Sequence, residues 1–214
     1  MFKYEMHLHT RNCSACGVAT SSEMAYSYAC AGYSGIVLTD HFLKGNTAVD
    51  RRLPWADKMN KYHESYLELK TEGEKNGISV FFGLEYSTGR GIEFLTYGID
   101  IDFLLRNPDI NDLSLEEYCH RVHLAGGFVA QAHPFRNKPY IDMTIKPQPQ
   151  YLDGIEVYNQ CNEKEWNDRA LALAKEYNLC QISGMDTHDA NFAGLAGIAC
   201  KHPITTNSEL VRVL

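Results

Sequence analysis

Two pairs of polar residues, each separated by a single position, stand out in this sequence. His7 and His9 lie near its start, and Asp186 and His188 lie near its end. Residues i and i+2 of an extended strand point to the same face, so each pair presents two side chains in one direction. Imidazoles and carboxylates arranged in this way can hold a divalent metal ion. Either pair alone is also compatible with a core or surface histidine pair, a turn or a helix N-cap.

Further candidate ligands end short apolar segments. His41 follows Asp40 at the end of one such segment, Glu85 ends a second and His133 ends a third. A buried carboxylate without a partner is costly, and a metal ion removes that cost. Adjacent residues on a strand point to opposite faces, so we expect His41 to bind metal and Asp40 to orient it or an incoming water. The alternatives are an aspartate that caps a turn and a hydrogen-bonded core histidine.

The segments that would position these residues alternate between strand and helix patterns. The pattern predicts strands at about 2–9, 35–39, 78–84, 93–97, 128–132, 155–157, 181–183 and 197–200. It predicts helices at about 22–31, 55–75, 114–126 and 164–177 and one that begins near 208. This alternation is typical of an α/β protein with a parallel sheet. The segment 136–153 is expected to be a long loop, and loops of that length are usually functional.

The position of the polar residues favours a barrel over an open sheet. Almost every predicted strand ends in a histidine or a carboxylate. Ligands from so many strands converge only where the strands form a ring, which predicts a (β/α) barrel, with fewer than eight units in a chain of this length. The chain has 214 residues, of which 44% are hydrophobic, and no linker divides it. We therefore expect a single domain over residues 1–214.

Composition excludes several classes of partner. The formal net charge is −7, and a basic surface for long nucleic acid is missing. We expect no signal peptide, because the first residues contain no apolar stretch, and no apolar run approaches the roughly 18 residues of a membrane span. The seven cysteines are an odd number, scattered along the chain, which favours reduced thiols. We expect a cytoplasmic protein that binds no membrane, and the sequence leaves its oligomeric state open.

Taken in order, these motifs resemble the PHP (polymerase and histidinol phosphatase) domain family. Segments similar to the four family motifs and its glutamate segment are 7–10 (HLHT), 38–41 (LTDH), 83–86 (GLEY), 132–134 (AHP) and 183–188 (SGMDTH). The resemblance covers most of the chain. It implies a single-domain α/β fold, the distorted (β/α)7 barrel, with a trinuclear metal centre at the carboxyl ends of the strands. It also implies hydrolysis of phosphoesters.

The resemblance further implies how the ligands divide among the metal ions. The first ion would be held by His7, His9, Glu85 and Asp186. Glu85 would bridge to a second ion shared with His133. His41 and His188 would hold the third.

Two positions depart from the family pattern. Glu93 stands where family members often have a histidine as the other ligand of the second metal, a chemically mild change. Cys16 stands where an aspartate or histidine follows the first motif. A thiolate there would bind the third metal beside His41 and His188, and its softness would favour zinc or iron. Alternatively, Cys16 is a small buried thiol, and water completes the third site or the site stays empty.

The expected activity is that of a metal-dependent phosphoesterase acting on a small phosphorylated metabolite or nucleotide. Two or three divalent ions, zinc, manganese or iron, would supply a bound hydroxide as nucleophile. Arg136, three residues after His133, is the first candidate for binding the phosphate, since a guanidinium forks onto phosphate oxygens. Lys44, three after His41, is the second candidate. A solvated loop arginine is the alternative reading of Arg136.

Two other classes of protein stay open. One is a PHP-like barrel that keeps its metal but has no turnover. The other is a C–N hydrolase of the amidohydrolase type, whose first strand also carries a His-x-His pair. Such barrels typically have a metal-bridging lysine on a middle strand, and no lysine ends a predicted strand here. The remaining histidines are expected on helix surfaces or in loops, at positions 63, 120, 123 and 202.

Overall fold

The strands and helices lie close to their predicted positions in the computed structural model, which describes residues 1–191 and 196–214. The strands are β1 (Phe2–Leu8), β2 (Gly35–Leu38), β3 (Ser79–Gly89), β4 (Ile92–Tyr97), β5 (Phe128–Gln131), β6 (Gly154–Asn159), β7 (Cys180–Gly184) and β8 (Ile198–Cys200). The helices are α1 (Ser21–Cys30), α2 (Trp55–Lys75), α3 (Ile101–Arg106), α4 (Leu115–Leu124), α5 (Lys164–Glu176) and α6 (Asn207–Val213). Two short 3-10 turns are η1 (Ile110–Asp112) and η2 (Pro149–Tyr151).

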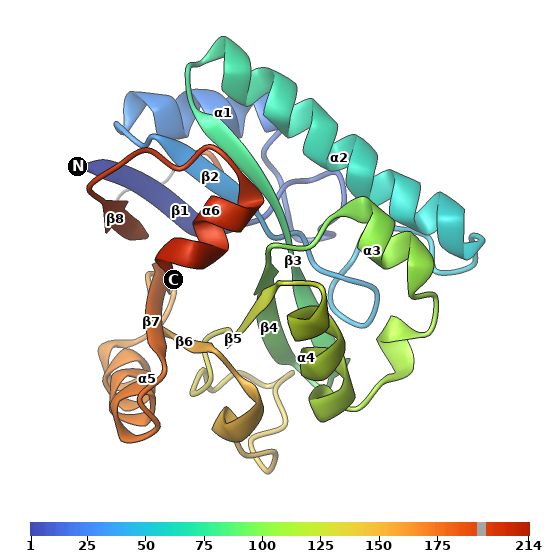
Figure 1. Ribbon diagram of the computed structural model, residues 1–214, viewed down its shortest axis with the longest axis vertical. Helices are drawn as coiled ribbons and strands as arrows, with labels where there is room; N and C mark the ends of the chain where they lie inside the picture. The colour runs from blue at the N-terminus through green and yellow to red at the C-terminus, as the bar shows by residue number, and fades with distance from the viewer. Residues whose placement is uncertain (192–195) are drawn as a thin grey trace.

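The strands in the described part of the chain form one curved sheet in the order β7-β6-β5-β4-β3-β2-β1-β8 (Figure 1). From β1 to β7 the spatial order follows the sequence, and the sheet bends until its ends meet. Leu8 at the end of β1 pairs in parallel with Thr187 just after β7. The backbone amide of His9 donates to the carbonyl of Thr187 at 3.0 Å. The sheet is therefore a nearly closed barrel, and the predicted α/β class with a distorted barrel is confirmed.

Two strands contradict the expectation of a parallel sheet. β4 is antiparallel to both β3 and β5, and β8 is antiparallel to β1. β3 and β4 are joined by a tight turn at Gly89, Arg90 and Gly91, and so short a connection allows only antiparallel pairing. The other neighbouring pairs, β1–β2, β2–β3, β5–β6 and β6–β7, are parallel.

The helix starts are encoded locally. The side chain of Thr20 begins α1 in a capping box with Glu23, and Ser114 begins α4 in the same way with Glu117. The sequence pattern did not reveal α3, because six residues give too little periodicity; the side chain of Asp100 caps it. None of the helices in the described residues combines the length and apolar character that crossing a bilayer requires.

A bulge in β1 decides which of its side chains face the barrel interior. The pairing with β2 shifts between Glu5 and Leu8. One extra residue reverses the alternation of side chains along a strand. Met6 thus belongs to the inner apolar cluster, and His7 nevertheless lies on the interior side, beside the other histidines. Side chains of β1 to β5 and β7 fill this interior together with Ile204 and Leu210, the latter from α6.

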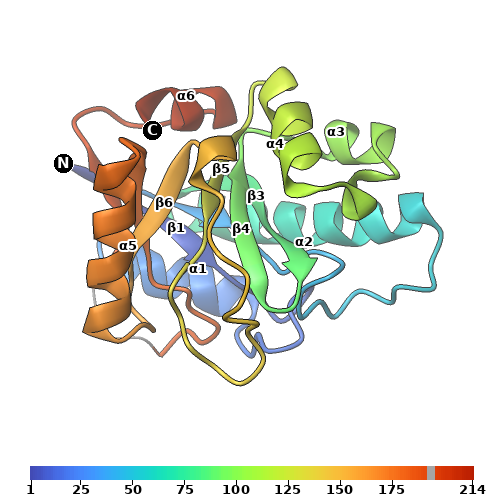
Figure 2. The ribbon, with the colours of Figure 1, turned by 90° about the horizontal axis from the view of Figure 1, so that it is seen from below.

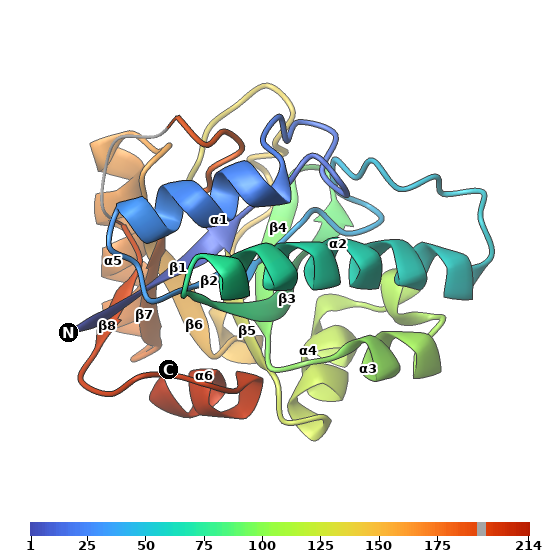
Figure 3. The same ribbon diagram turned by 90° about the horizontal axis from the view of Figure 1, so that it is seen from above.

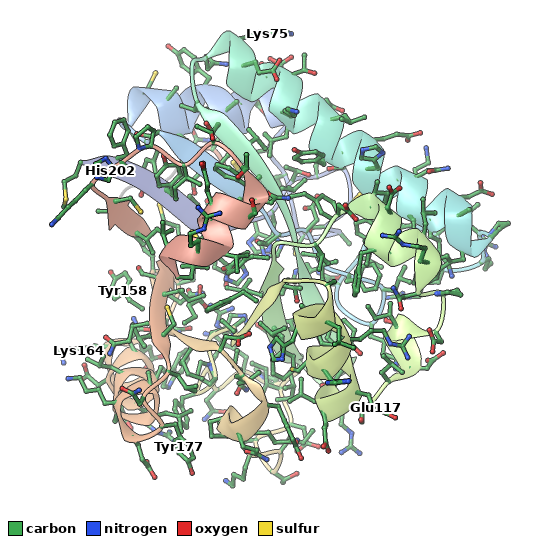
Figure 4. All side chains as sticks on the ribbon, in the orientation of Figure 1. Lys75, Glu117, Tyr158, Lys164, Tyr177 and His202 are labelled. Carbon is green, nitrogen blue, oxygen red and sulfur yellow. The ribbon has the colours of Figure 1, made fainter. Side chains whose placement is uncertain are left out.

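The two ends of the barrel differ. The loops that follow β1, β2 and β5 gather at one end, and α6 covers the other (Figures 2 and 3). Charged side chains such as Lys75, Glu117 and Lys164 point outward from the surrounding helices (Figure 4). Most predicted ligands lie at or just after the carboxyl ends of the parallel strands, the end that carries the long loops. The prediction that Glu85 ends its strand was wrong, because β3 continues to Gly89 in its hairpin with β4, and Glu93 lies at the start of β4.

Candidate metal centre

Side chains at one end of the barrel converge in four overlapping groups of three. Within each group the nearest ligand atoms lie within 4.8 Å of one another. The groups are His7–His9–Glu85, His7–His133–Asp186, His41–Glu85–Glu93 and His9–His41–His188. Except for the partly exposed His188, all of these residues are buried. The structure thus brings together all of the predicted histidine and carboxylate ligands.

Glu85 occupies the middle of this cluster. Its Oε1 lies 3.1 Å from His7 Nε2 and 3.2 Å from His133 Nε2. Its Oε2 lies 2.5 Å from His41 Nδ1 and 3.7 Å from His9 Nε2. The two oxygens therefore face different histidines, as the carboxylate of a bridging ligand would.

Asp186 faces the first pair of histidines. Its Oδ1 lies 3.3 Å from His9 Nε2 and 3.4 Å from His7 Nε2. Its Oδ2 is 2.7 Å from Nη2 of Arg136. The backbone of Asp186 has a φ of 53°, in the left-handed region that aspartate and asparagine tolerate better than most residues. This turn directs the carboxylate back into the barrel mouth.

Glu93 lies on the opposite side of the cluster, on β4. Its Oε1 is 3.5 Å from His41 Nδ1, and its Oε2 is 3.6 Å from His133 Nε2. It therefore stands between His133, which is assigned to the second metal, and His41, which is assigned to the third. The antiparallel course of β4 places it there, because β4 runs alongside β3 and returns its first residues to the mouth of the barrel.

Two histidines are held in a defined tautomer. His7 Nδ1 donates to Oε1 of Glu156 at 2.8 Å. His188 Nδ1 donates to the backbone carbonyl of Asp186 at 3.0 Å. Because a carboxylate or carbonyl oxygen accepts the hydrogen in these contacts, Nδ1 holds it in each ring, and in the neutral ring Nε2 keeps its lone pair. Both rings therefore present Nε2 as a metal ligand.

His9 reaches the same state through a serine. Its Nδ1 lies 3.1 Å from Oγ of Ser14, and that hydroxyl donates to Asp40 Oδ1 at 2.8 Å. The hydroxyl hydrogen is thus engaged by the carboxylate, and the oxygen accepts from the imidazole. The third imidazole in the cluster therefore also presents Nε2.

Asp40 lies behind the cluster. It accepts from the amide of Thr10 at 2.7 Å and from the hydroxyls of Thr10, Ser14 and Ser65 at 2.8–3.1 Å. Its link to His41 runs through Ser14, whose Oγ accepts from the His41 amide at 3.0 Å. Asp40 thus reaches the backbone of His41 rather than its imidazole, and it does not line the cavity over the cluster, so its role in orienting His41 or a water stays a prediction. Its contacts anchor the loop between β1 and α1.

The donor atoms of this cluster fit divalent metal ions. His7 Nε2, His9 Nε2, His41 Nδ1 and Glu85 Oε2 are buried, and among the described residues they have no hydrogen-bond partner of suitable geometry. Yet these atoms lie 2.5–3.7 Å from one another or from further ligand atoms. A cation between them would satisfy all of them. Imidazole and carboxylate ligands suit zinc, manganese and iron.

The carboxylates of the cluster differ in how readily they ionise. Despite burial, the charges of His41 and His7 hold the pKa of Glu85 well below its usual range. The pKa of Asp186 is likewise held low, chiefly by His7, in spite of burial. Burial and the charge of Glu85 raise the pKa of Glu93 to about 7. Glu85 and Asp186 are therefore anionic without metal. Glu93 lies beside the negative charge of Glu85, and a metal cation between them would offset that repulsion.

Cys16 lies at the outer edge of the cluster. Its Sγ is 3.2 Å from His41 Nε2. Burial raises the pKa of the thiol, but hydrogen bonds with His188 and His41 outweigh this and lower it to about 6. The cysteine thus faces the two histidines assigned to the third metal, as the sequence predicted. Its role as a ligand stays a prediction.

We expect Cys16→Ala to reduce the zinc bound per chain by one ion, with the remaining ions retained. The reason is that a site of His41 and His188 alone has too few protein ligands to hold zinc tightly. Elemental analysis after dialysis measures the stoichiometry, and Cys30→Ala, an exposed cysteine on α1, is the matched control. An unchanged zinc content in Cys16→Ala would show that the sulfur is not a ligand.

A cavity of about 570 Å³ opens over the cluster. Beyond the metal ligands, its lining includes Lys44, Arg90, Arg136 and Tyr140. Lys44 is paired with the exposed Asp112 at 3.5 Å. Both residues predicted to bind substrate therefore line the cavity. Arg90 and Tyr140 were missed, because nothing in their local sequence distinguishes a cavity wall from an ordinary loop.

Arg136 is not a free loop side chain. It is 9% exposed, and its Nε donates to Asn162 Oδ1 at 2.8 Å. Its Nη2 donates to Asn159 Oδ1 at 2.9 Å and pairs with Asp186. The solvated-loop alternative is therefore wrong. The sequence did not reveal the asparagines, which come from the far end of β6 and the loop after it.

Comparisons with known proteins bear on the class of this chain. No family model matches the sequence, and no protein of curated function does so either. Solved structures match over most of the chain. One is a proposed metal-dependent phosphoesterase from Bifidobacterium adolescentis, with a TM-score of 0.61, 16% identity and coverage of 99% of this chain and 95% of that one.

A second match is a two-domain protein from Bacteroides vulgatus that contains a predicted PHP-like metal-dependent phosphoesterase. Its TM-score is 0.61 at 18% identity, and the match covers 87% of this chain and 52% of that one. An amidohydrolase from Chromobacterium violaceum, solved with sulfate and without metal, matches at a TM-score of 0.59, with 16% identity and 87% of each chain. Endonuclease Q bound to a 27-mer duplex with an abasic lesion matches at 0.58, with 13% identity, 89% of this chain and 50% of that one.

These likenesses concern the fold. The chain has the barrel of PHP-like metal-dependent phosphoesterases, and the resemblance seen in the motifs is confirmed at that level. Fold alone does not give a substrate. The chemistry of this chain has to be argued from its own cluster and cavity.

Proposed function

We propose that this protein is a metal-dependent phosphoesterase that hydrolyses a small phosphorylated metabolite or nucleotide. The observation that carries the proposal is the buried group of three ring nitrogens and Oε2 of Glu85, which lack hydrogen-bond partners among the described residues. This group lies under a cavity whose wall includes Lys44, Arg90 and Arg136. Cationic side chains in the cavity wall and metal ions in the cluster beneath it would both attract the negative charge of a phosphate ester.

The proposed ligand sets are those that the family resemblance implies, with Glu93 and Cys16 added, and they overlap the observed groups without coinciding with any one of them. One ion would be held by His7, His9, Glu85 and Asp186; a second by Glu85, Glu93 and His133; and a third by His41, His188 and Cys16. When bound, such ions polarise the phosphoryl oxygens and lower the pKa of water toward ~7. The metals are proposed to be zinc, manganese or iron, in two or three sites.

The protein side chains would bind and orient the substrate. Arg136 is fixed by Asn159, Asn162 and Asp186, so it binds a phosphoryl oxygen with little further loss of conformational freedom. Lys44 would give up its exposed partner Asp112 to contact the same anion. Neutralising the charge that develops on a transferred phosphoryl group is a main part of such catalysis.

A direct test uses protein stripped of metal and reloaded with manganese or zinc. We expect hydrolysis of p-nitrophenyl phosphate and of at least one compound in a panel of phosphorylated metabolites and nucleotides. The stripped protein should show no release of phosphate. Failure of every metal and every ester in the panel would contradict the proposal and favour a metal-binding barrel without turnover.

The same assay separates the rival activities. The likeness to Endonuclease Q makes a nucleic-acid phosphodiester the second candidate substrate, although the net charge of −7 disfavours a long polyanion. Cleavage of an oligonucleotide in preference to all small esters would show that a nucleic-acid phosphodiester is the substrate. The likeness to an amidohydrolase raises C–N hydrolysis. Against this, the central position between the histidines is held by Glu85 rather than by a bridging lysine.

We further propose a cytoplasmic location. All seven cysteines are free thiols. Disulfides are rare where glutathione and thioredoxin keep thiols reduced, so this set supports a reducing compartment. Fractionation of the native host cell would test it.

We expect Arg136→Ala to lower kcat/KM for the best ester by about ten- to a hundredfold, from ~1.5–3 kcal/mol for a charged hydrogen bond. Arg136→Lys should recover only part of this, since an ammonium cannot donate a parallel pair of hydrogen bonds. Steady-state kinetics with metal content measured in each variant is the check. Unchanged kinetics in Arg136→Ala at full metal occupancy would remove the residue from substrate binding.

A further inference from the structure

A bulge in β6 turns two of its polar side chains toward the metal centre. Glu156 pairs with Ile182, but Tyr158 pairs with Ser183, so β6 has one residue more than β7 at this point. In a regular strand, residues three apart face opposite sides. The bulge instead leaves Glu156 and Asn159 both fully buried and in contact with each other.

Glu156 accepts hydrogen bonds from three separate donors. Its Oε1 accepts from His7 Nδ1 at 2.8 Å. Its Oε2 accepts from the backbone amide of His133 at 2.9 Å and from Nδ2 of Asn159 at 3.0 Å. One carboxylate thus contacts the ring of one predicted ligand, His7, and the backbone of another, His133, which are proposed to hold different metal ions. The hydrogen bond from the backbone amide of His133 to Glu156 also helps to fix the backbone of His133, whose φ of 29° is unusual for a residue with a side chain.

Space for this contact is provided by Gly184 on β7. A Cβ atom at that position would lie 2.5 Å from the Cβ of His7 and 3.0 Å from Oε1 of Glu156. Both distances are shorter than an ordinary contact, so any larger residue would push the imidazole and the carboxylate apart. A glycine at position 184 on β7 is therefore what allows His7 and Glu156 to stay in contact.

We propose that Glu156 is a positioning residue of the metal centre: it holds His7 with Nε2 free for metal and fixes the segment that carries His133. The inference rests on the proposed metal-dependent function and extends it to a residue outside the ligand set. A carboxylate is required here because three N–H donors converge on it and it has only acceptors to offer. An amide must present its NH₂ group to at least one of those donors.

The test compares Glu156→Gln with wild type in zinc affinity, measured by competition with a chromophoric chelator. We expect the tightest zinc site to weaken by about ten- to a hundredfold, the usual cost of losing a partner behind a ligating histidine. The melting temperature of the metal-free protein should stay within a few degrees of wild type. Glu156→Asp, which keeps the charge on a shorter side chain, should recover part of the affinity.

Asp153→Asn is the matched control. Oδ2 of Asp153 also accepts from an imidazole, Nε2 of His123 at 2.7 Å, and from a backbone amide, that of Val129 at 2.8 Å, but neither residue belongs to the metal-binding groups. The zinc affinity of this variant should equal that of wild type. Wild-type affinity in Glu156→Gln would overturn the inference, and so would loss of the metal-free fold, which would indicate a packing role. If the wild-type protein itself binds no zinc, manganese or iron, the proposed function fails instead.

Discussion

Asp186→Asn is expected to lower kcat/KM for the best phosphoester by at least about a thousandfold, which corresponds to about 4 kcal/mol of transition-state stabilisation. The carboxylate lies between His7 and His9 and also pairs with Arg136. The variant removes one of the few negative charges available to hold cations in the cluster. The amide keeps the size of the side chain, so the loss should come from metal binding and charge rather than from packing.

Asparagine is the appropriate replacement because of the backbone. Asp186 has a φ of 53°, and asparagine tolerates this region about as well as aspartate does. Alanine there would add about 1 kcal/mol of strain, which would confuse a loss of metal with a loss of stability.

Asp189→Asn makes the same change of charge three residues further on, at an exposed position, and serves as the control. Its kcat/KM should stay within about twofold of wild type, the small effect expected of a surface substitution. Metal content and melting temperature should be measured for both variants. Wild-type turnover by Asp186→Asn with its metals in place would mean that the active site lies elsewhere.

Removal of the metals is the second large perturbation. Chelation and dialysis should reduce hydrolysis to background, and added zinc, manganese or iron should restore it. The melting temperature should also fall. Ligand at a hundred times its dissociation constant stabilises the folded state by about 2.7 kcal/mol per site, and for a chain of this size that is roughly 5–10 °C.

The physical reason lies in the uncompensated atoms of the cluster. Glu85, Glu93 and Asp186 place three carboxylates within one small buried region. Without cations, the burial of Glu93 beside Glu85 is unfavourable, as the rise of its pKa to about 7 shows. Metal ions offset this repulsion and give the unpartnered ring nitrogens a cation to coordinate.

Differential scanning fluorimetry of stripped and reloaded protein measures the stability effect, and the Asp186→Asn variant provides the comparison. Since that variant should bind metal weakly, its melting temperature should respond little to added metal. Equal melting temperatures for stripped and reloaded wild type, together with retained turnover, would show that metal serves neither stability nor catalysis.

Much of this molecule follows from local sequence. The capping boxes at Thr20 and Ser114 define where two helices begin, because a cap involves only residues three apart. Short apolar segments that end in a histidine or carboxylate predicted the strands and nearly all of the cluster. These features could be predicted because each depends only on residues that are neighbours in the sequence. The barrel could be predicted from one further condition: ligands that end many different strands can meet only if the strands form a ring.

Other features depended on contacts between distant segments. The antiparallel course of β4 came from its tight turn with β3, while its predicted position alone suited either direction. The bulges in β1 and β6 depend on register with neighbouring strands, and register cannot be seen in the alternation of one strand.

Glu156 illustrates the difference. Its signal, a carboxylate in a buried strand, is the same signal that singled out Glu85. Only the fold shows that Glu85 faces the metal-binding atoms while Glu156 stands behind His7. Sequence fixes which residues have the chemistry to bind a metal. Tertiary structure decides which of them meet the metal and which hold the others in place, because that depends on distances between strands far apart in the chain.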